Sequence, residues 1–178
     1  MPEMMTEATK AAPLVLNKKA YGAIAVLVVE DAAHMASLVC GILKSLGVGH
    51  IYEARNGDDA LDILATLPVD AILIDDLKPP LDGLTVVKTI RKAQAKPPRD
   101  LPVIFMTSKL RKSEIIAARD AGVTEVLSRP FSAAQLVARL ESVLVKPRPL
   151  VETAEFVGPD RRRRTKVPDT RRRLSDAS

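Results

Sequence analysis

Apolar residues along the chain fall into short continuous runs, separated by stretches with helical spacing. The runs Ile24–Val29, Ala71–Ile74 and Val103–Met106 have the length and composition of strands buried on both faces. The more polar segment His50–Ala54 and the short segment Val126–Leu127 are compatible with two further strands. The pattern therefore predicts five strands.

Between the strands, apolar residues recur at the spacing of amphipathic helices. In the first helix Met35, Leu38, Ile42 and Leu46 follow at helical spacing, and Gly47 ends it. Cys40 lies among the apolar positions of this helix and is expected to be a small core residue. A second helix is predicted at about 57–67 with Asn56 as its cap, and a third follows Gly83 with Leu84, Val87 and Ile90 on its inner face. A fourth is predicted at about 111–121. The last begins at a capping box of Ser132 and Gln135, and its inner face carries Leu136, Val137, Leu140 and Leu144.

Strand–helix pairs with short connections predict an α/β domain: a doubly wound, five-stranded parallel sheet with helices on both faces. In such sheets a ligand site lies at the carboxyl ends of the strands, where the winding direction reverses. We place the domain at residues 21–146, after an N-terminal extension of residues 1–20. Pro147 and Pro149 are expected to end the folded part, which leaves residues 147–178 as a basic, Pro- and Arg-rich tail.

The composition is typical of a single intracellular domain. Of the 178 residues 47% are apolar, which is enough for a substantial core. Cys40 is the single cysteine, no apolar run is long enough to cross a membrane, and the N-terminus lacks the pattern of a signal peptide. We therefore expect a cytoplasmic protein without a membrane partner.

The net charge of +5 lies in the tail, because residues 1–145 contain as many acidic as basic residues. The runs Arg161–Arg164 and Arg171–Arg173 could bind nucleic acid, but Phe156 is the only aromatic residue near them. We therefore expect a solvated arm and no nucleic-acid partner. If the extensions are instead ordered, they must dock on the body or on a second copy, so a homodimer is also expected.

Acidic residues stand at the ends of two apolar strands. Glu30 and Asp31 follow the first strand, and Asp75 ends the third. If these strands are neighbours, three carboxylates converge, and their mutual repulsion would raise their pKa values. A divalent cation relieves the repulsion, and Mg²⁺ fits best because it takes oxygen ligands and commonly bridges to phosphoryl oxygens. Simple solvation explains one such acid better than it explains three.

An ordered set of short motifs resembles the receiver domain of bacterial two-component response regulators, over about Ala23 to Val145. The motifs are Val26–Asp31, Ala54–Gly57 with Ala60 and Leu61, Asp70–Asp75, Pro79, Asp82 with Gly83, Thr107 with Ser108, and Arg129–Phe131, where the family has Lys-Pro-Phe. Each motif alone is weak, whereas the ordered set is specific. The resemblance implies a flavodoxin-like sheet of order 2-1-3-4-5 in a single-domain, chemotaxis-regulator-like protein with an Arg-rich tail.

The resemblance implies that Asp75 is the phosphoacceptor, because the spacing to Pro79 and Gly83 selects it over Asp76. The phosphoryl group would come from a sensor histidine kinase or a histidine phosphotransfer protein. The other implied roles are Mg²⁺ binding by Glu30, Asp31, Asp75 and the Leu77 carbonyl, phosphoryl binding by Thr107 with Ser108 beside it, and a phosphate-binding cation at Arg129.

Three positions depart from the family pattern, and two more stand where the family controls the lifetime of the phosphoryl group. Arg129 replaces a lysine, Val126 stands where active members carry a switching aromatic residue, and Lys78 replaces a methionine. We expect phosphorylation to persist with an altered read-out, because Arg and Lys bind phosphate differently. Leu77 and Lys109 offer no carboxylate or amide to orient a water molecule, which predicts slow self-dephosphorylation.

Other functions stay open beside a phosphorylation-dependent signalling protein that acts through protein contacts and is not an enzyme. The chain could be a pseudo-receiver whose pocket no longer switches, or could bind nucleic acid through its tail. A magnesium-dependent phosphatase with an aspartyl-phosphate intermediate usually places two aspartates one residue apart, which the adjacent Asp75 and Asp76 do not match.

Overall fold

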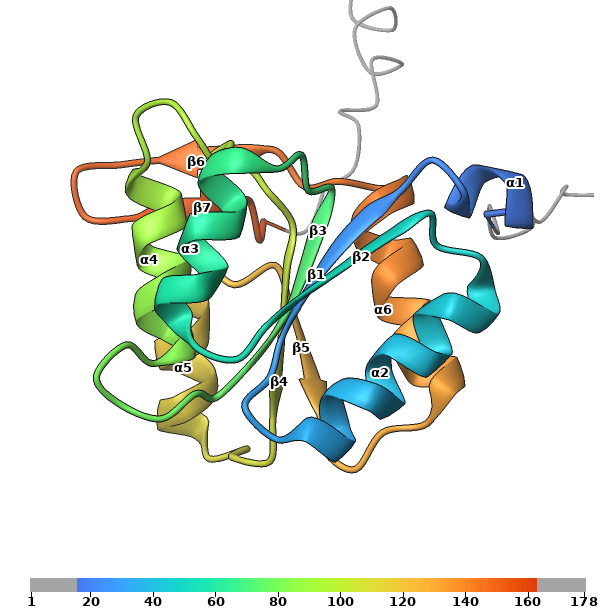
Figure 1. The fold of residues 1–178 in the computed structure, drawn as a ribbon. Coiled ribbons are helices and arrows are strands. Elements are labelled where there is room, and N and C mark those ends of the chain that lie inside the picture. The colour runs from blue at the N-terminus through green and yellow to red at the C-terminus, as the bar shows by residue number, and fades with distance from the viewer. Residues whose placement is uncertain (1–15, 163–178) are drawn as a thin grey trace, which may run out of the picture.

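The structure is a computed structural model, and it describes residues 16–162 (Figure 1). The elements in chain order are α1 (Lys18–Tyr21), β1 (Ala25–Val29), α2 (Ala33–Leu46), β2 (His50–Ala54), α3 (Gly57–Thr66), β3 (Ala71–Asp75), α4 (Gly83–Lys92), β4 (Val103–Thr107), α5 (Lys112–Ala121), β5 (Glu125–Ser128), α6 (Ala133–Val145), β6 (Leu150–Glu152) and β7 (Val157–Pro159).

Strands β1 to β5 form one parallel sheet in the order β2-β1-β3-β4-β5, which confirms the predicted fold class and strand order. Val29 of β1 pairs with Ile74 of β3, and Asp75 of β3 pairs with Met106 of β4. The three central strands therefore end at nearly the same level. Any side chains that follow them meet at one edge of the sheet.

Helices cover both faces of the sheet, which explains the continuous apolar runs. Successive side chains of a strand point to opposite faces. Leu27 and Val29 lie in one core with α3, α4 and α5, whereas Val26 and Val28 lie in the other core with α2 and α6 (Figure 1). Every residue of β1, β3 and β4 is buried as a result.

Two predicted helix starts are confirmed by their caps. The Asn56 side chain accepts a hydrogen bond of 2.8 Å from the backbone N–H of Asp59. Ser132 and Gln135 form the predicted capping box, in which each side chain accepts a hydrogen bond from the other residue's N–H. These local signals fix where α3 and α6 begin, because they satisfy N–H groups that have no partner within the helix.

The predicted burial of Cys40 in α2 is confirmed, whereas the apolar stripe of this helix is only partly buried. The helix turns Ala36, Val39, Cys40 and Leu43 towards the sheet, whereas Leu38 is 52% exposed. Ile42 and Leu46 pack against the core while partly exposed. The apolar residues of the predicted stripe lie on the flank of the buried face.

The folded part extends beyond the predicted boundaries at both ends. Asn17 caps the short helix α1, and Tyr21 of this helix is buried, with its hydroxyl donating to Glu141 of α6 over 2.8 Å. At the other end Pro147 and Pro149 do not end the fold, because β6 and β7 pair as an antiparallel hairpin. The hairpin packs on α4 and α5 (Figure 1). Residues 171–173 of the predicted tail lie outside the described range.

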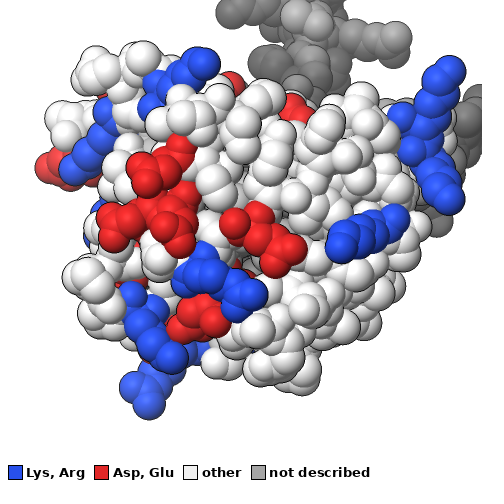
Figure 2. All heavy atoms as spheres, in the orientation of Figure 1, with Lys and Arg blue, Asp and Glu red and all other residues white. Residues whose placement is uncertain are grey.

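The surface charges are mixed on the side of the molecule that Figure 2 shows. Lysine and arginine side chains lie scattered among acidic and uncharged residues there. Within residues 16–162 no helix is long and apolar enough to span a membrane.

Candidate functional site

The ends of β1 and β3 bring three carboxylates together. Glu30 directly follows β1, and Asp75 is the last residue of β3, its direct neighbour in the sheet. One oxygen each from Glu30, Asp31 and Asp75 lies within 4.8 Å of the others. Glu30 and Asp75 are buried, and Asp31 is half-buried. The predicted convergence of these acids is confirmed, whereas their role as metal ligands stays a prediction.

Arg129 connects the far edge of the sheet to this acidic cluster. Its backbone N–H, just after β5, donates to the Thr107 carbonyl over 3.0 Å. Its side chain reaches across β4, and Nη2 lies 2.6 Å from Oε2 of Glu30 and 2.6 Å from Oδ1 of Asp75. Only 22% of the Arg129 side chain is exposed. This contact therefore lies inside the pocket and is not a pair on the open surface.

One donor of Arg129 has no partner among the described residues. Its Nε atom is buried and donates to no protein acceptor in that range. A buried donor without an acceptor is unfavourable, so most such groups in proteins find one. The Nε–H is therefore available to an anion that enters the pocket.

The protonation of Glu30 depends on opposing influences. Burial raises the pKa of Glu30 above its ordinary value, and the neighbouring Asp75 carboxylate raises it as well. The Ala32 N–H, which donates to Glu30 over 3.0 Å, and the Arg129 guanidinium lower this pKa. The net direction is upward, as expected where acids share a buried site.

The remaining predicted site residues lie around the same edge. Thr107 ends β4 and is buried, and its hydroxyl accepts a hydrogen bond of 3.0 Å from the Lys109 N–H. Ser108 is exposed and lines a hollow of about 340 Å³ together with Arg129. Leu77 is buried just after Asp75, and its N–H donates to the Asp75 carbonyl over 3.0 Å. Their roles towards a ligand stay predictions.

Gly83 fixes the backbone on which Asp75 sits. A Cβ atom at Gly83 would lie 2.2 Å from the carbonyl oxygen of Asp75, closer than any real contact. The preceding Asp82 caps α4, because its side chain accepts a hydrogen bond of 2.8 Å from the Thr85 N–H. The Asp-Gly pair therefore starts α4 close against the end of β3.

Residues 26–141 match the family described as the response regulator receiver domain. The chain belongs to this family. It is 31% identical over 129 residues to the chemotaxis protein CheY-3 of Vibrio cholerae, covering 72% of this chain and 95% of that protein. The chain is 30% identical over 135 residues to the phosphate regulon transcriptional regulatory protein PhoB of Klebsiella pneumoniae. This aligned region covers 75% of the chain but only 58% of PhoB.

A solved receiver domain shows the same architecture. The receiver domain of the sensor histidine kinase PA1611 from Pseudomonas aeruginosa has a TM-score of 0.61 and 27% identity, over 68% of this chain and 97% of that one. That structure holds a magnesium ion in its active-site cleft. The two receiver domains thus share their fold, including the sheet whose strand ends carry the acidic residues of this chain.

Two lysines near the acidic cluster form ion pairs with aspartates that the sequence did not predict. Lys78 pairs with Asp31 over 3.3 Å, and Lys109 pairs with Asp76. Asp76 thus points to a partner outside the three-carboxylate cluster, in agreement with the choice of Asp75. The sequence analysis considered both lysines only as departures or tuning positions, because ion pairs between loops leave no periodic signal.

Proposed function

We propose that this receiver domain is a phosphoacceptor in a two-component phosphorelay, working in the cytoplasm through protein contacts and not as an enzyme. Asp75 takes the phosphoryl group from a sensor histidine kinase or a histidine phosphotransfer protein. The observation that carries the proposal is the position of Asp75. Asp75 is a buried carboxylate at a strand end, in contact with the Arg129 guanidinium and beside two further acids.

The chain's own groups suit a phosphoryl group on Asp75. Transfer forms a bond between a carboxylate oxygen of Asp75 and phosphorus while the phosphorus–nitrogen bond of the donor histidine breaks. The Thr107 hydroxyl ends the neighbouring strand and donates to no protein acceptor in the described range, so its hydrogen is available to a phosphoryl oxygen. Arg129 offers its unpaired Nε–H and its positive charge. Arginine and hydroxyl donors commonly hold phosphate.

Magnesium fits the donor set of this pocket. Three carboxylates within one small site supply the oxygen ligands that this cation prefers. Glu30, Asp31 and Asp75 would hold it, with the Leu77 carbonyl as the remaining protein ligand. Bound there, the cation would neutralise charge on the transferring phosphoryl oxygens.

The decisive experiment measures intact mass after incubation with Mg²⁺ and a small-molecule phosphodonor such as acetyl phosphate. The wild type is expected to gain one phosphoryl group, and Asp75→Asn to gain none. Asp76→Asn is the matched control, because Asp76 is adjacent in sequence and pairs with Lys109 outside the cluster. It should be phosphorylated like the wild type. Equal uptake by Asp75→Asn and the wild type would contradict the proposal.

A pseudo-receiver is the second candidate, and the Arg129 contacts favour it. A guanidinium that already bridges Glu30 and Asp75 could hold the pocket in one state. Val126 is half-buried and packs against a core cluster, with no aromatic ring to change position. Absence of phosphoryl uptake at saturating Mg²⁺ would support this alternative. The expected homodimer stays a prediction, which light scattering on the purified protein would measure.

A further inference from the structure

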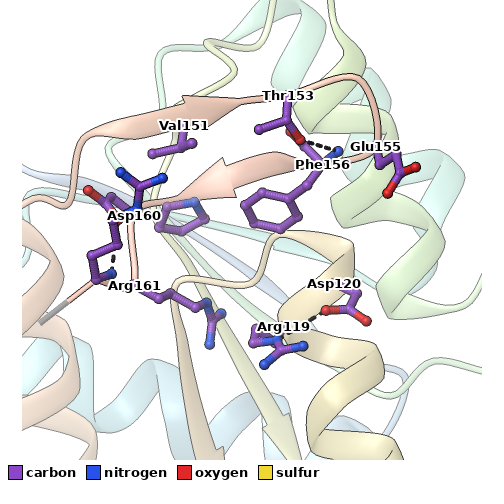
Figure 3. Close-up of a pocket in the computed structure, with 10 residues that line it drawn as sticks. Arg119, Asp120, Val151, Thr153, Glu155, Phe156, Asp160 and Arg161 are labelled. Carbon is purple, nitrogen blue, oxygen red and sulfur yellow. Dashed lines mark hydrogen bonds and ion pairs between the residues drawn. The ribbon is translucent and has the colours of Figure 1, made fainter.

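The β6–β7 hairpin builds a second pocket, at the end of the sheet opposite Asp75 (Figure 1). The pocket has a volume of about 630 Å³ and lies between the hairpin and the end of α5. Figure 3 shows Phe156 and Val151 on the hairpin side and Arg119 with Asp120 on the helix side. Pockets of this size commonly hold small molecules.

The hairpin wall of the pocket is fixed in place. The turn is closed by Thr153 and Phe156, whose N–H donates to the Thr153 hydroxyl over 3.0 Å. On the other strand, a Cβ at Gly158 would lie 2.9 Å from the Cα atom of Gly122, so the two backbones pack without a side chain between them. Glu152 pairs with Arg99 over 3.0 Å. The pocket is therefore formed before any ligand enters, which lowers the cost of binding.

Arg161 contributes an exposed positive charge to the lining of the pocket. Its guanidinium donates to the carbonyl of Val123 and pairs with no carboxylate within residues 16–162. The nearby Arg119 and Arg148 each have an acidic partner, Asp120 and Glu125 respectively. Burial lowers the pKa of Arg161, repulsion from Arg148 and Arg119 lowers it further, and the carboxylates of Glu125 and Asp120 partly offset these effects. An anion at Arg161 would offset this repulsion.

The other half of the pocket suits a flat aromatic ring. Phe156 is half-buried, and together with Val151 and Pro159 it forms an apolar wall. Base–aromatic stacking and arginine–phosphate contact are the two ways in which proteins commonly hold nucleotides. A lone aromatic residue near the arginine run gave little support for base stacking from the sequence, but the hairpin brings the Phe156 ring and Arg161 to one pocket.

The charge of the lining limits the size of the anion. Asp120, Glu155 and Asp160 line the pocket together with three arginines, so the lining as a whole is balanced. A long polyanion would gain little from such a surface, because the acids repel the phosphates beyond the first ones. A small ligand with one or two phosphates would meet Arg161 and Arg162 and, among the acids, chiefly Asp160, whose carboxylate accepts a hydrogen bond of 2.9 Å from the Arg162 N–H.

We propose that the pocket between the β6–β7 hairpin and α5 binds a nucleoside mono- or diphosphate, with the base on Phe156 and the phosphate on Arg161. This proposal goes beyond the phosphoacceptor role and does not depend on it. Calorimetric titration of the full chain with AMP, ADP, GMP and GDP tests it. At least one of them is expected to bind with a dissociation constant below about 1 mM.

The variants Arg161→Gln and Phe156→Leu are each expected to weaken binding by about tenfold or more. Arg139→Gln is the matched control, because Arg139 is a half-exposed arginine of α6 that pairs with Glu125 and does not line the pocket. It should bind like the wild type. Thermal unfolding of each variant separates a lost ligand contact from a displaced hairpin. The proposal expects Arg161→Gln to weaken binding while it lowers the unfolding temperature by only about a few degrees, because this variant loses one hydrogen bond to the Val123 carbonyl.

Four outcomes would overturn the proposal. The first is that no nucleotide binds at millimolar concentration. The second is that inorganic phosphate binds as tightly as the nucleotides, which would leave no role for the Phe156 ring. A single-stranded oligonucleotide of the same base binds more tightly per site, which makes nucleic acid the partner. Asp75→Asn abolishes the binding, which assigns it to the acidic pocket; unchanged binding in this variant supports the hairpin pocket.

Discussion

Arg129 and Glu30 are 99 residues apart in sequence, yet they form an ion pair of 2.6 Å that spans the sheet from β5 to β1. The Glu30 side chain is completely buried. A buried carboxylate is unfavourable unless a partner compensates it, and Arg129 supplies both a charge and a hydrogen bond. The same nitrogen contacts Asp75, so one side chain stabilises the two most buried acids of the receiver site.

Replacing this arginine should therefore destabilise the domain. We expect Arg129→Ala to lower the free energy of unfolding by about 2–3 kcal/mol at neutral pH, because it leaves buried carboxylates without their cation. Urea denaturation measures the change. Arg139→Ala, which removes a half-exposed pair of 3.5 Å, should cost less than about 0.5 kcal/mol. Equal stability of Arg129→Ala and the wild type would show that the pair contributes nothing.

Gly83 offers a test of the backbone that carries Asp75, the proposed phosphoacceptor. We expect Gly83→Ala to lower stability by about 2 kcal/mol or more and to slow phosphorylation of Asp75, because the new Cβ would lie 2.2 Å from the Asp75 carbonyl oxygen. A backbone oxygen cannot move away without shifting the end of β3. Denaturation and intact-mass time courses measure the two effects.

Gly41→Ala is the matched control for this substitution. A Cβ at Gly41 meets nothing within 4 Å, and the residue lies inside helix α2. Alanine should therefore raise stability by about 0.5–1 kcal/mol, because it restricts the unfolded chain and favours the helix. If both substitutions have the same effect, the close approach of Gly83 to Asp75 is not what makes glycine necessary there.

Burial of Cys40 predicts a dependence of stability on pH. Burial raises the pKa of this thiol to about 11, and the nearby Glu53 adds to the effect. An unfolded thiol titrates at about 8.5, so between these values the folded state binds more protons than the unfolded state. The Cys40 contribution to stability is therefore complete below about pH 8.5 and decreases as the pH rises towards 11, by at most about 1.4 kcal/mol per pH unit.

Urea denaturation at a series of alkaline pH values measures this slope. Tyr21 has a raised pKa for the same main reason, and it adds a slope of the same sign. The difference between the wild type and Cys40→Ala isolates the thiol, because the tyrosine is common to both. The native thiol should also react slowly with a thiol reagent at pH 8. Rapid reaction of folded protein at that pH would contradict the burial of Cys40.

The sequence predicted the sheet because its strands follow from local pattern. Continuous apolar runs indicate strands covered on both faces, and short connections leave few topologies. That Glu30 and Asp75 end neighbouring strands followed from the strand order that the family resemblance implied, and the sheet confirms it. The contact of Arg129 with both acids could not be derived in this way. It depends on the path of one long side chain over β4, which no periodicity records.

The errors have the same physical origin. The apolar stripe of α2 included Leu38, which is 52% exposed, because helical spacing alone does not say how far the buried face extends around the helix. The tail was taken as solvated because it is rich in proline and arginine. Its order instead depends on distant residues, since the hairpin packs against Gly122 of the α5–β5 turn and the Arg91 side chain that supports this turn.

Truncation tests whether the hairpin belongs to the fold. A chain that stops after Lys146 loses β6 and β7, and with them the Arg161 contact to the Val123 carbonyl and the cover over Gly122. We expect the free energy of unfolding to fall by about 2 kcal/mol, because apolar surface of α4 and α5 becomes exposed. A chain that stops after Arg162 keeps these contacts and should retain the stability of the full chain. If residues 147–178 were a solvated arm, both truncations would unfold at the same urea concentration as the full chain.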